Sequence, residues 1–188
     1  MLEKEVDAAI SASGSSDVNS AKTRADEMFT KMCKKFRSKK SVWIAHFKYL
    51  LKGSRHEEAH NLLKRSLQSL PTYKHQTVMN KFAQLEFELG SPERGRTIFN
   101  ALLKKHPKLD LLFVNIDKEV KYGDIAKARA LFDSVVNPVS NEHEFKFSDK
   151  QMKSLFKKWY RMEEKHGDEN SQERVKEEAR TFVAKTSS

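Results

Sequence analysis

One pattern of apolar residues and prolines recurs along the chain, and this recurrence restricts the fold more than any other feature. Three segments hold a small residue, then large apolar residues, and then a proline 12, 12 and 10 positions after the small residue. The small residues are Ala59, Gly95 and Ala128, and the prolines are Pro71, Pro107 and Pro138. A stretch with helical apolar spacing precedes each segment: Val42–Lys52, Thr77–Leu89 and Leu109–Tyr122. The repeated unit is therefore a helix, a tight turn, a second helix and a proline, which ends a helix because it lacks the backbone N–H.

Two further parts of the chain extend this series. The turns of the first three units recur after 36 and then 33 residues, and the next turn, at Gly167, follows after 44. An inserted loop at residues 139–149 explains the longer step, and the fourth unit is expected to have helices near 148–166 and 171–184. At the other end, residues 21–36 carry an apolar stripe that predicts the second helix of a unit whose first helix is missing.

The repeats predict an all-α protein: an α-solenoid of about nine helices, built from stacked antiparallel helical hairpins. The expected repeat domain covers residues 21–186, with a half unit at 21–38 and full units at 41–71, 74–107, 108–138 and 148–184. Residues 1–20 end in a run of small polar side chains and are expected to be a flexible lead-in.

Charge and composition narrow the class of partner. The 188 residues include 36 Lys and Arg against 26 Asp and Glu, a net charge of +10 that favours a polyanionic partner. No apolar run approaches the roughly 18 residues of a membrane span, so no membrane contact is expected. The single cysteine, Cys33, cannot form an internal disulfide and is expected to pack in the apolar stripe of the first helix.

One motif suggests catalysis. His56, Glu57 and His60 form an H-E-x-x-H sequence, in which two histidines one helical turn apart can bind zinc and the glutamate can act as a base. The charge of Glu58, the alignment of Ala59 with the small packing residues of the other repeats, and the lack of an obvious third ligand favour two surface histidines instead, with Glu86 and Glu88 left open as ligands. Because the phosphate-binding and nucleophile motifs are absent as well, we expect no enzymatic activity, no cofactor and no metal, with a zinc hydrolase as a remote alternative.

Two basic clusters are candidate contacts for RNA or an acidic partner. The first includes Lys34, Lys35, Arg37, Lys39 and Lys40, and the second comprises Lys150, Lys153, Lys157, Arg161 and Lys165. The second set is spaced by 3, 4, 4 and 4 residues, which places its members along one ridge of a helix. The alternative interpretation of both clusters is a solubilising surface.

A charged signature accompanies the repeats. The position four residues before each turn is Leu50, Glu86, Glu119 or Glu163, and Arg96 and Arg129 each follow a glutamate by ten residues. We predict that Glu86 pairs with Arg96, and Glu119 with Arg129, across the turn of each hairpin. Trp43 and Trp159 occupy equivalent regions of the first helices and are expected to be core residues.

This combination of an apolar or aromatic start, a late glutamate and a small-Arg-x-apolar-Phe segment resembles the HAT (half-a-TPR) repeat. The resemblance implies a protein that works in RNA-handling assemblies, because HAT repeats occur mainly there. It gives the signature residues named above a structural role.

Three longer segments are similar to the C-terminal region of the eukaryotic rRNA-biogenesis scaffold family, also called the programmed cell death protein eleven family. They are FR with KSVWI at 36–44, KFAQLEF with GSPER at 81–94, and FKKWY with EEKHG at 156–167. In that family, N-terminal OB-fold repeats bind pre-ribosomal RNA and the helical repeats support early pre-rRNA cleavages. The resemblance covers roughly residues 22–184 and implies that this chain is the helical module alone.

The resemblance implies a non-enzymatic scaffold of ribosome biogenesis in the nucleus and nucleolus. Its expected partners are ribosome-assembly proteins, with pre-rRNA as a further candidate through the basic clusters, and it is expected to be a monomer within a large ribonucleoprotein complex. The alternative is a HAT-repeat scaffold of mRNA 3′-end processing or splicing, where such repeats commonly dimerise.

Overall fold

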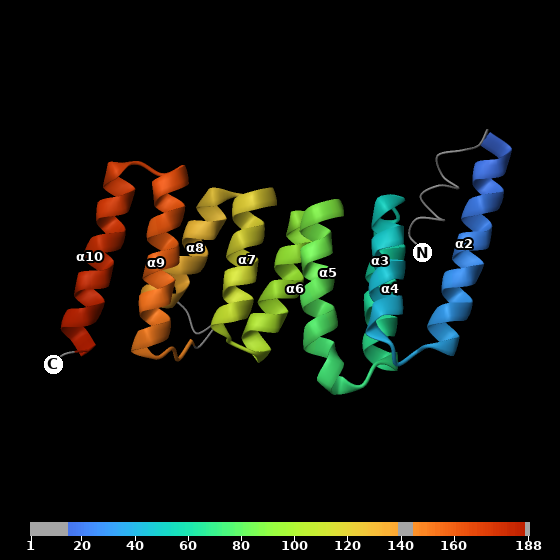
Figure 1. The fold of residues 1–188 in the computed structure, drawn as a ribbon, viewed down its shortest axis with the longest axis horizontal. Coiled ribbons are helices and arrows are strands. Elements are labelled where there is room, and N and C mark those ends of the chain that lie inside the picture. The colour runs from blue at the N-terminus through green and yellow to red at the C-terminus, as the bar shows by residue number, and fades with distance from the viewer. Residues whose placement is uncertain (1–14, 139–144, 187–188) are drawn as a thin grey trace. The chain divides into compact units, whose positions relative to one another are not determined.

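The computed structural model describes residues 15–138 and 145–186, and over these ranges the protein is all-α, as predicted (Figure 1). The described residues form nine α-helices and a short 3-10 helix. They are α2 (Ser15–Lys35), α3 (Lys40–Lys52), α4 (His56–Ser69), η1 (Thr72–Lys74), α5 (His75–Leu89), α6 (Pro92–Lys105), α7 (Leu109–Tyr122), α8 (Ile125–Val136), α9 (Asp149–His166) and α10 (Glu169–Thr186). The predicted helical-repeat class is therefore confirmed.

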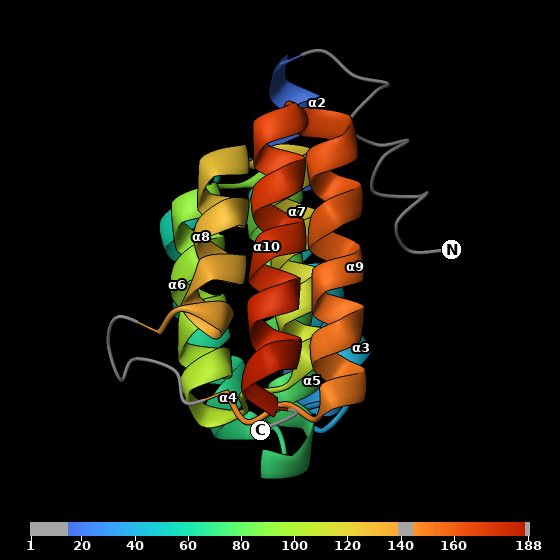
Figure 2. The ribbon, with the colours of Figure 1, turned by 90° about the vertical axis from the view of Figure 1, so that its left-hand side faces the viewer.

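The chain divides into two compact units, Met1–Gly90 and Ser91–Ser188. Within each unit every helix packs against the next one along the chain, so sequence order and spatial order coincide. In the second unit α10 lies beside α8 and α9 (Figure 2), and Arg174 of α10 pairs with Asp133 of α8 at 2.5 Å. The boundary between the units falls in the turn from α5 to α6, inside the repeat expected at residues 74–107.

The first helix begins earlier than predicted. Residues 15–20 belong to α2, whereas the sequence suggested a flexible lead-in as far as residue 20. Once the apolar stripe of residues 21–35 has formed a helix, each added residue gains one hydrogen bond, so small polar residues can extend it. Residues 1–14 lie outside the described residues.

The start of α9 follows a capping box. The Ser148 side chain accepts a hydrogen bond from the Gln151 backbone N–H, and the Gln151 side chain accepts one from the Ser148 backbone N–H. Two backbone donors at the start of the helix are thereby satisfied. Residues 139–144 of the predicted inserted loop lie outside the described residues.

Aromatic rings join the second helix of one hairpin to the first helix of the next. Phe29 of α2 stacks on His46 of α3 with ring centroids 4.8 Å apart, and Phe132 of α8 stacks on Trp159 of α9 at 5.3 Å. Each phenylalanine lies four residues after a buried alanine, which lets the facing helix approach. Trp43 and Trp159 are 2 % and 1 % exposed, so the prediction that both are core residues is confirmed.

His46 is the polar member of this seam. It is 7 % exposed, and its Nδ1 lies 3.6 Å from the sulfur of the buried Cys33. Burial lowers the pKa of His46 to about 4, because the charged imidazolium loses its hydration in this apolar environment. The packing therefore requires the neutral form of the ring.

A buried glutamate lies over the glycine that ends each of three first helices. The amides of Gly90, Gly123 and Gly167 donate to the backbone carbonyls of Glu86, Glu119 and Glu163 at 2.9, 3.0 and 2.9 Å. A Cβ atom on these glycines would lie 2.2, 2.1 and 2.3 Å from a carboxylate oxygen of the same glutamates. The spacing of Glu and Gly by four residues therefore reflects a close contact that leaves no room for a side chain at the turn.

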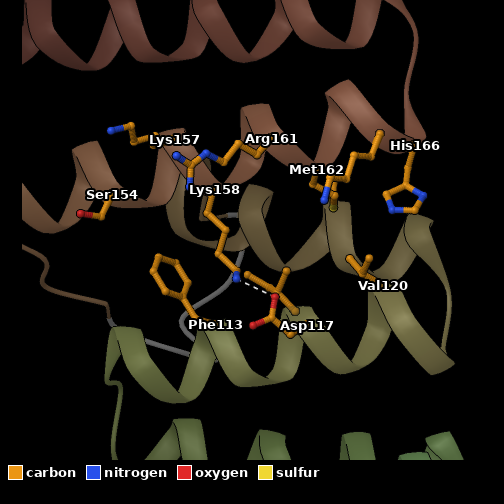
Figure 3. A pocket seen from close by; sticks show the side chains of 11 residues that line it. Phe113, Asp117, Val120, Ser154, Lys157, Lys158, Arg161, Met162 and His166 are labelled. Atoms are coloured by element: carbon orange, nitrogen blue, oxygen red, sulfur yellow. Dashed lines mark hydrogen bonds and ion pairs between the residues drawn. The ribbon is translucent and has the colours of Figure 1, made fainter.

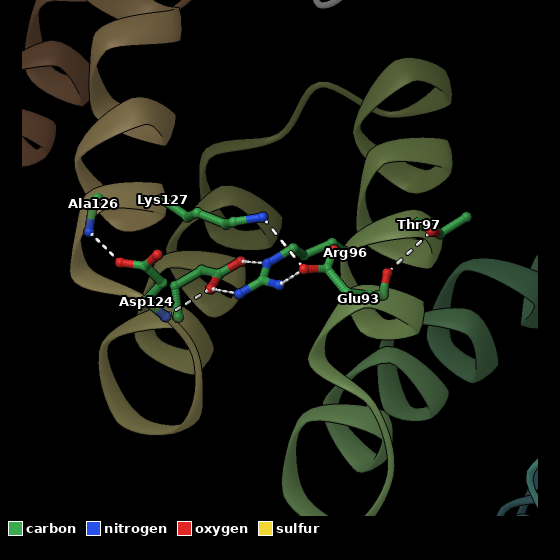
Figure 4. Close-up of polar contacts among 7 residues, drawn as sticks. Glu93, Arg96, Thr97, Asp124, Ala126 and Lys127 are labelled. Carbon is green, nitrogen blue, oxygen red and sulfur yellow. Dashed lines mark hydrogen bonds and ion pairs between the residues drawn. The ribbon is translucent and has the colours of Figure 1, made fainter.

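Arginine from the preceding hairpin fixes two of these carboxylates, and Figure 4 shows the contacts of the first, Arg96. Arg96 of α6 donates to Glu119 of α7 through Nε at 2.6 Å and Nη2 at 2.7 Å. Arg129 of α8 likewise binds Glu163 of α9, with the shortest contact at 2.8 Å. Burial alone would raise the pKa of Glu163, but hydrogen bonds from Arg129 and Trp159 outweigh it and hold the pKa below its ordinary value.

The predicted pairing of Glu119 with Arg129 across one hairpin turn is therefore wrong. Arg129 follows a buried alanine on the face of α8 that packs against α9, so its guanidinium reaches the next hairpin. The ion pairs join successive repeats, whereas the turn within a hairpin is closed by the glutamate and the glycine. Glu86 and Arg96 lie in different compact units, and their pairing stays a prediction.

The first hairpin uses the opposite arrangement of charges. Leu50 takes the place of the glutamate, and Asp26 follows Ala25 just as Arg96 follows Gly95. Arg55, five residues after Leu50, donates to Asp26 of α2 at 2.6 Å and also binds Glu58. The contact between successive helices is thus kept with its two charges exchanged.

We predict that Gly123→Ala destabilises the chain by about 1–3 kcal/mol, the usual cost of overpacking. The added Cβ would meet the Glu119 carboxylate at 2.1 Å, and this carboxylate is held by Arg96. Gly53→Ala is the matched control, because the nearest atoms would lie 3.6 Å from its new Cβ. Urea unfolding followed by circular dichroism should show a lower unfolding midpoint for Gly123→Ala only. Equal midpoints for the two variants would contradict the packing described.

We also predict an acid-dependent loss of stability that originates at His46. Its pKa is about 4 in the fold and 6.5 in the unfolded chain, so the unfolded chain takes up the proton first as the pH falls. This contribution is complete above pH 6.5, decreases between pH 6.5 and 4, and amounts to about 3 kcal/mol in total. Thermal unfolding of the parent and of His46→Phe over this range should show a steeper decline for the parent. Titration of His46 itself near pH 6.5 by NMR in the folded chain would contradict the prediction.

Candidate partner-binding surfaces

The first basic cluster lies at the corner where α2 meets α3. Lys34, Lys35, Arg37, Lys39 and Lys40, here called the α2–α3 corner, are all exposed. The indole N–H of the buried Trp43 donates to the carbonyl of Arg37 at 2.8 Å, so the turn backbone is fixed against the core. None of the five side chains forms an ion pair with another described residue. The corner therefore presents concentrated positive charge that its own fold does not neutralise.

Two exposed aromatic rings accompany these cations. Phe36 is 40 % exposed and Tyr73 is 78 % exposed, and the ammonium groups of Lys35 and Lys74 lie 5.5 and 5.3 Å from their respective ring centroids. Lys74 also donates to the carbonyl of Ser38 at 2.8 Å, which holds η1 against the α2–α3 corner. Cations interleaved with exposed rings are the combination that binds single-stranded nucleic acid through phosphates and base stacking.

The sequence interpretation missed the role of these rings. Phe36 continues the helical spacing of the α2 stripe and so resembles a core residue. Tyr73 follows Pro71 in a short connecting segment, and only the contact between Lys74 and Ser38 brings it to the corner.

The second basic cluster forms an exposed ridge on α9. Lys150, Lys153, Lys157, Arg161 and Lys165 are all exposed. The opposite face of the helix is buried through Met152, Leu155, Phe156 and Trp159. No ridge side chain pairs with an acidic group within the ranges that the structure describes. The spacing by 3 and 4 residues therefore does place five cations on one side of the helix.

Three of the ridge residues also line a groove of about 450 Å³ between α7 and α9 (Figure 3). The groove is lined by Phe113, Ile116, Asp117, Val120, Ser154, Lys157, Lys158, Arg161, Met162, Lys165 and His166. Its apolar groups come from both helices, and its cations come from α9. Lys150 and Lys153 do not line it, so the ridge divides into a part beside the groove and a part beyond it.

Lys158, which lies outside the predicted ridge, closes part of the groove floor. Its ammonium group pairs with Asp117 of α7 at 2.6 Å and lies 5.0 Å from the Phe113 ring centroid. One residue of difference along α9 turns this lysine toward α7, whereas Lys157 stays exposed. Sequence spacing on a single helix could not identify Lys158 because its partners belong to another helix.

The H-E-x-x-H motif does not assemble a metal site in the part of the chain that the structure describes. Glu58 pairs with Arg55, and Ala59 is fully buried against the neighbouring helices, whereas Glu57 and His60 are exposed. No group of three or more His, Cys, Asp or Glu side chains that could hold a metal occurs among the described residues. The hypothesis of a zinc hydrolase through His56, Glu57 and His60 therefore gains no support from the geometry.

Cys33 and His46 are close but poorly suited to nucleophilic catalysis. Cys33 is 2 % exposed, and burial raises the pKa of its thiol, whereas a nucleophilic cysteine needs a lowered pKa and access. Among the described helices, none combines the length and the apolar character that crossing a bilayer requires. Among the described residues, the candidate surfaces for a partner are the α2–α3 corner and the groove with its ridge.

Comparison with known proteins finds relatives that share the name RRP5. The chain is 44% identical over 165 residues to the rRNA biogenesis protein rrp5 of Schizosaccharomyces pombe, covering 87% of this chain and 9% of that protein. It is 36% identical to the RRP5 homolog of Mus musculus and 37% identical to that of Homo sapiens, in each case over 87% of this chain and 8% of the relative. The chain therefore spans less than a tenth of the length of these relatives. No family model matches it.

We predict that the α2–α3 corner retains single-stranded RNA. Changing Lys35, Arg37 and Lys39 to Glu should abolish retention of a 12-nucleotide RNA in a gel shift, because repulsion replaces three phosphate contacts. Tyr73→Ala should weaken binding by about 1–3 kcal/mol through lost stacking. The matched control changes Lys104, Lys105 and Lys108, all exposed cations of the other compact unit, to Glu. Equal loss in the control would show that only net charge matters.

Proposed function

Because the chain is homologous to one segment of the RRP5 rRNA biogenesis proteins, we propose that it is a helical-repeat scaffold of ribosome biogenesis. In this proposal it supports pre-rRNA processing by binding assembly factors, and it contacts pre-rRNA through basic side chains. The observation that carries the proposal is the 44% identity over 165 residues to a protein named for rRNA biogenesis. The chain acts without catalysis of its own, and the relatives' roles as whole proteins are extended to it only as part of the proposal.

The helical architecture supports a scaffold role. Successive helices pack in sequence order within each compact unit, and ion pairs such as Arg129–Glu163 fix one hairpin against the next. Stacked repeats create extended surfaces on which many weak contacts act together. Rigid presentation of side chains is thus the mechanism we propose.

The charge distribution supports contact with RNA. The net charge of +10 includes five exposed cations at the α2–α3 corner, where the rings of Phe36 and Tyr73 are also exposed. Phosphate contacts of this kind position a nucleic acid without reading its sequence. In our proposal the RNA segment is therefore selected by the rest of the assembly, while this chain adds affinity and orientation.

The proposed place of action is the nucleus and nucleolus, where ribosome precursors form. We further propose that the chain is a monomer within a large ribonucleoprotein complex. Sedimentation of the purified chain at micromolar concentration should give a single species of about one chain mass, 21.8 kDa. A symmetric dimer would favour the alternative HAT-repeat role in mRNA 3′-end processing or splicing.

Affinity purification of the tagged chain from nuclear extract tests the proposed function. We expect enrichment of pre-ribosomal proteins and pre-rRNA at least tenfold above a tag-only control. The variant with Lys35, Arg37 and Lys39 changed to Glu should keep the protein partners and lose most of the pre-rRNA, because only the polyanion contact is removed. Recovery of splicing or polyadenylation factors without pre-ribosomal components would overturn the proposal.

A further inference from the structure

We propose that the groove between α7 and α9 binds an acidic amphipathic helix of a partner protein. An apolar side chain of this helix enters the groove, and carboxylates along the same helix meet Lys157, Arg161 and Lys165. The inference rests on the proposed scaffold function and specifies the chemistry of one of its protein partners.

The floor of the groove supplies the apolar contact. Ile116 and Met162 are 1 % and 6 % exposed and form its base, while Phe113 and Val120 are partly buried at its sides. The volume of about 450 Å³ lies within the roughly 300–1,000 Å³ of protein pockets that bind ligands. An aliphatic side chain that enters this space removes apolar surface of both partners from water.

The wall of the groove supplies positive charge without an internal counter-charge. Lys157, Arg161 and Lys165 form no ion pair with another described residue. The one acidic residue of the lining, Asp117, is paired with Lys158 at 2.6 Å. Charge complementarity therefore selects carboxylates, whose charge-assisted hydrogen bonds to Lys and Arg are the stronger kind.

The spacing of these cations matches a helix. Consecutive members of the set Lys157, Arg161 and Lys165 are four residues apart, which corresponds to about 6 Å along α9. Glutamates four residues apart on a partner helix have the same separation, with leucines on an adjacent face to meet the floor. A helix laid into an apolar groove is a recurrent mode of peptide recognition.

The same geometry disfavours nucleic acid at this groove. Lys158 lies 5.0 Å from the Phe113 ring centroid and so occupies the position where a base would stack. Phosphates cannot satisfy the apolar floor, whereas the α2–α3 corner offers rings as exposed as Tyr73 at 78 %. The two surfaces therefore differ in partner, with RNA at the corner and an acidic helix at the groove.

Fluorescence anisotropy with the full chain at 0.15 M salt tests the inference. The probe is a labelled 18-residue helical peptide of Glu, Ala and Leu, with glutamates four residues apart and leucines on the adjacent face. We expect saturable binding that weakens at least fivefold when alanines replace the leucines. Lys157→Glu with Arg161→Glu should weaken it at least tenfold, whereas the matched control, Lys104→Glu with Lys105→Glu, should change it less than twofold.

A variant of the apolar side of the groove separates groove binding from charge attraction. Val120→Gln places a neutral polar group among the apolar ones and should weaken peptide binding at least fivefold while leaving RNA retention at the α2–α3 corner unchanged. Retained RNA binding and an unchanged helical circular dichroism spectrum show that this variant is folded.

Three outcomes would overturn the inference: no peptide binding, equal binding of the peptide without leucines, or displacement of the peptide by a 12-nucleotide RNA. The last outcome would assign the groove to nucleic acid. If the peptide does not bind while the tagged chain still recovers pre-ribosomal components, the inference fails and the proposed function stands. Failure of both would remove the scaffold proposal as well.

Discussion

The repeats depend on a buried carboxylate at the end of the first helix of a hairpin. Glu119 and Glu163 are each 2 % exposed, and a buried charge of this kind is tolerated only when it is paired and hydrogen-bonded. Arginine from the preceding hairpin supplies the pair, and the glycine of the turn leaves space for the carboxylate. Removing one partner of such a pair costs about 3–5 kcal/mol, so the contact fixes the order in which hairpins pack. Because its two charged side chains come from successive hairpins, the ion pair links one repeat to the next.

One position on the first helix of each hairpin differs from repeat to repeat. It lies four residues before Leu50, Glu86, Glu119 or Glu163 and holds His46, Phe82, Asn115 or Trp159, all four of them buried. Phe82 stacks on Phe47 at 3.9 Å, and Trp159 stacks on Phe132 and donates to Glu163. Asn115 is the costly member, since its Oδ1 has no hydrogen-bond partner among the described residues. The repeats thus share this helical position but differ in the chemistry of the side chain that occupies it.

The two candidate surfaces lie in different compact units and offer different chemistry. The α2–α3 corner lies where α2 meets α3, at the opposite end of α3 from Leu50 and Arg55, and it combines cations with exposed rings. The groove lies between α7 and α9 and combines cations with an apolar floor.

The sequence by itself determined the helices, their order and the small, aromatic and glycine positions, because 3.6-residue periodicity and turn chemistry are local properties. It identified the ridge on α9 for the same reason. Only the tertiary structure decided that Arg129 reaches Glu163 and not Glu119, that Lys158 closes a groove with Asp117, and that Tyr73 joins the α2–α3 corner. Each of these contacts joins residues on different helices, and their geometry depends on how far a side chain reaches across a packed interface. Spacing along one helix carries no information about that distance.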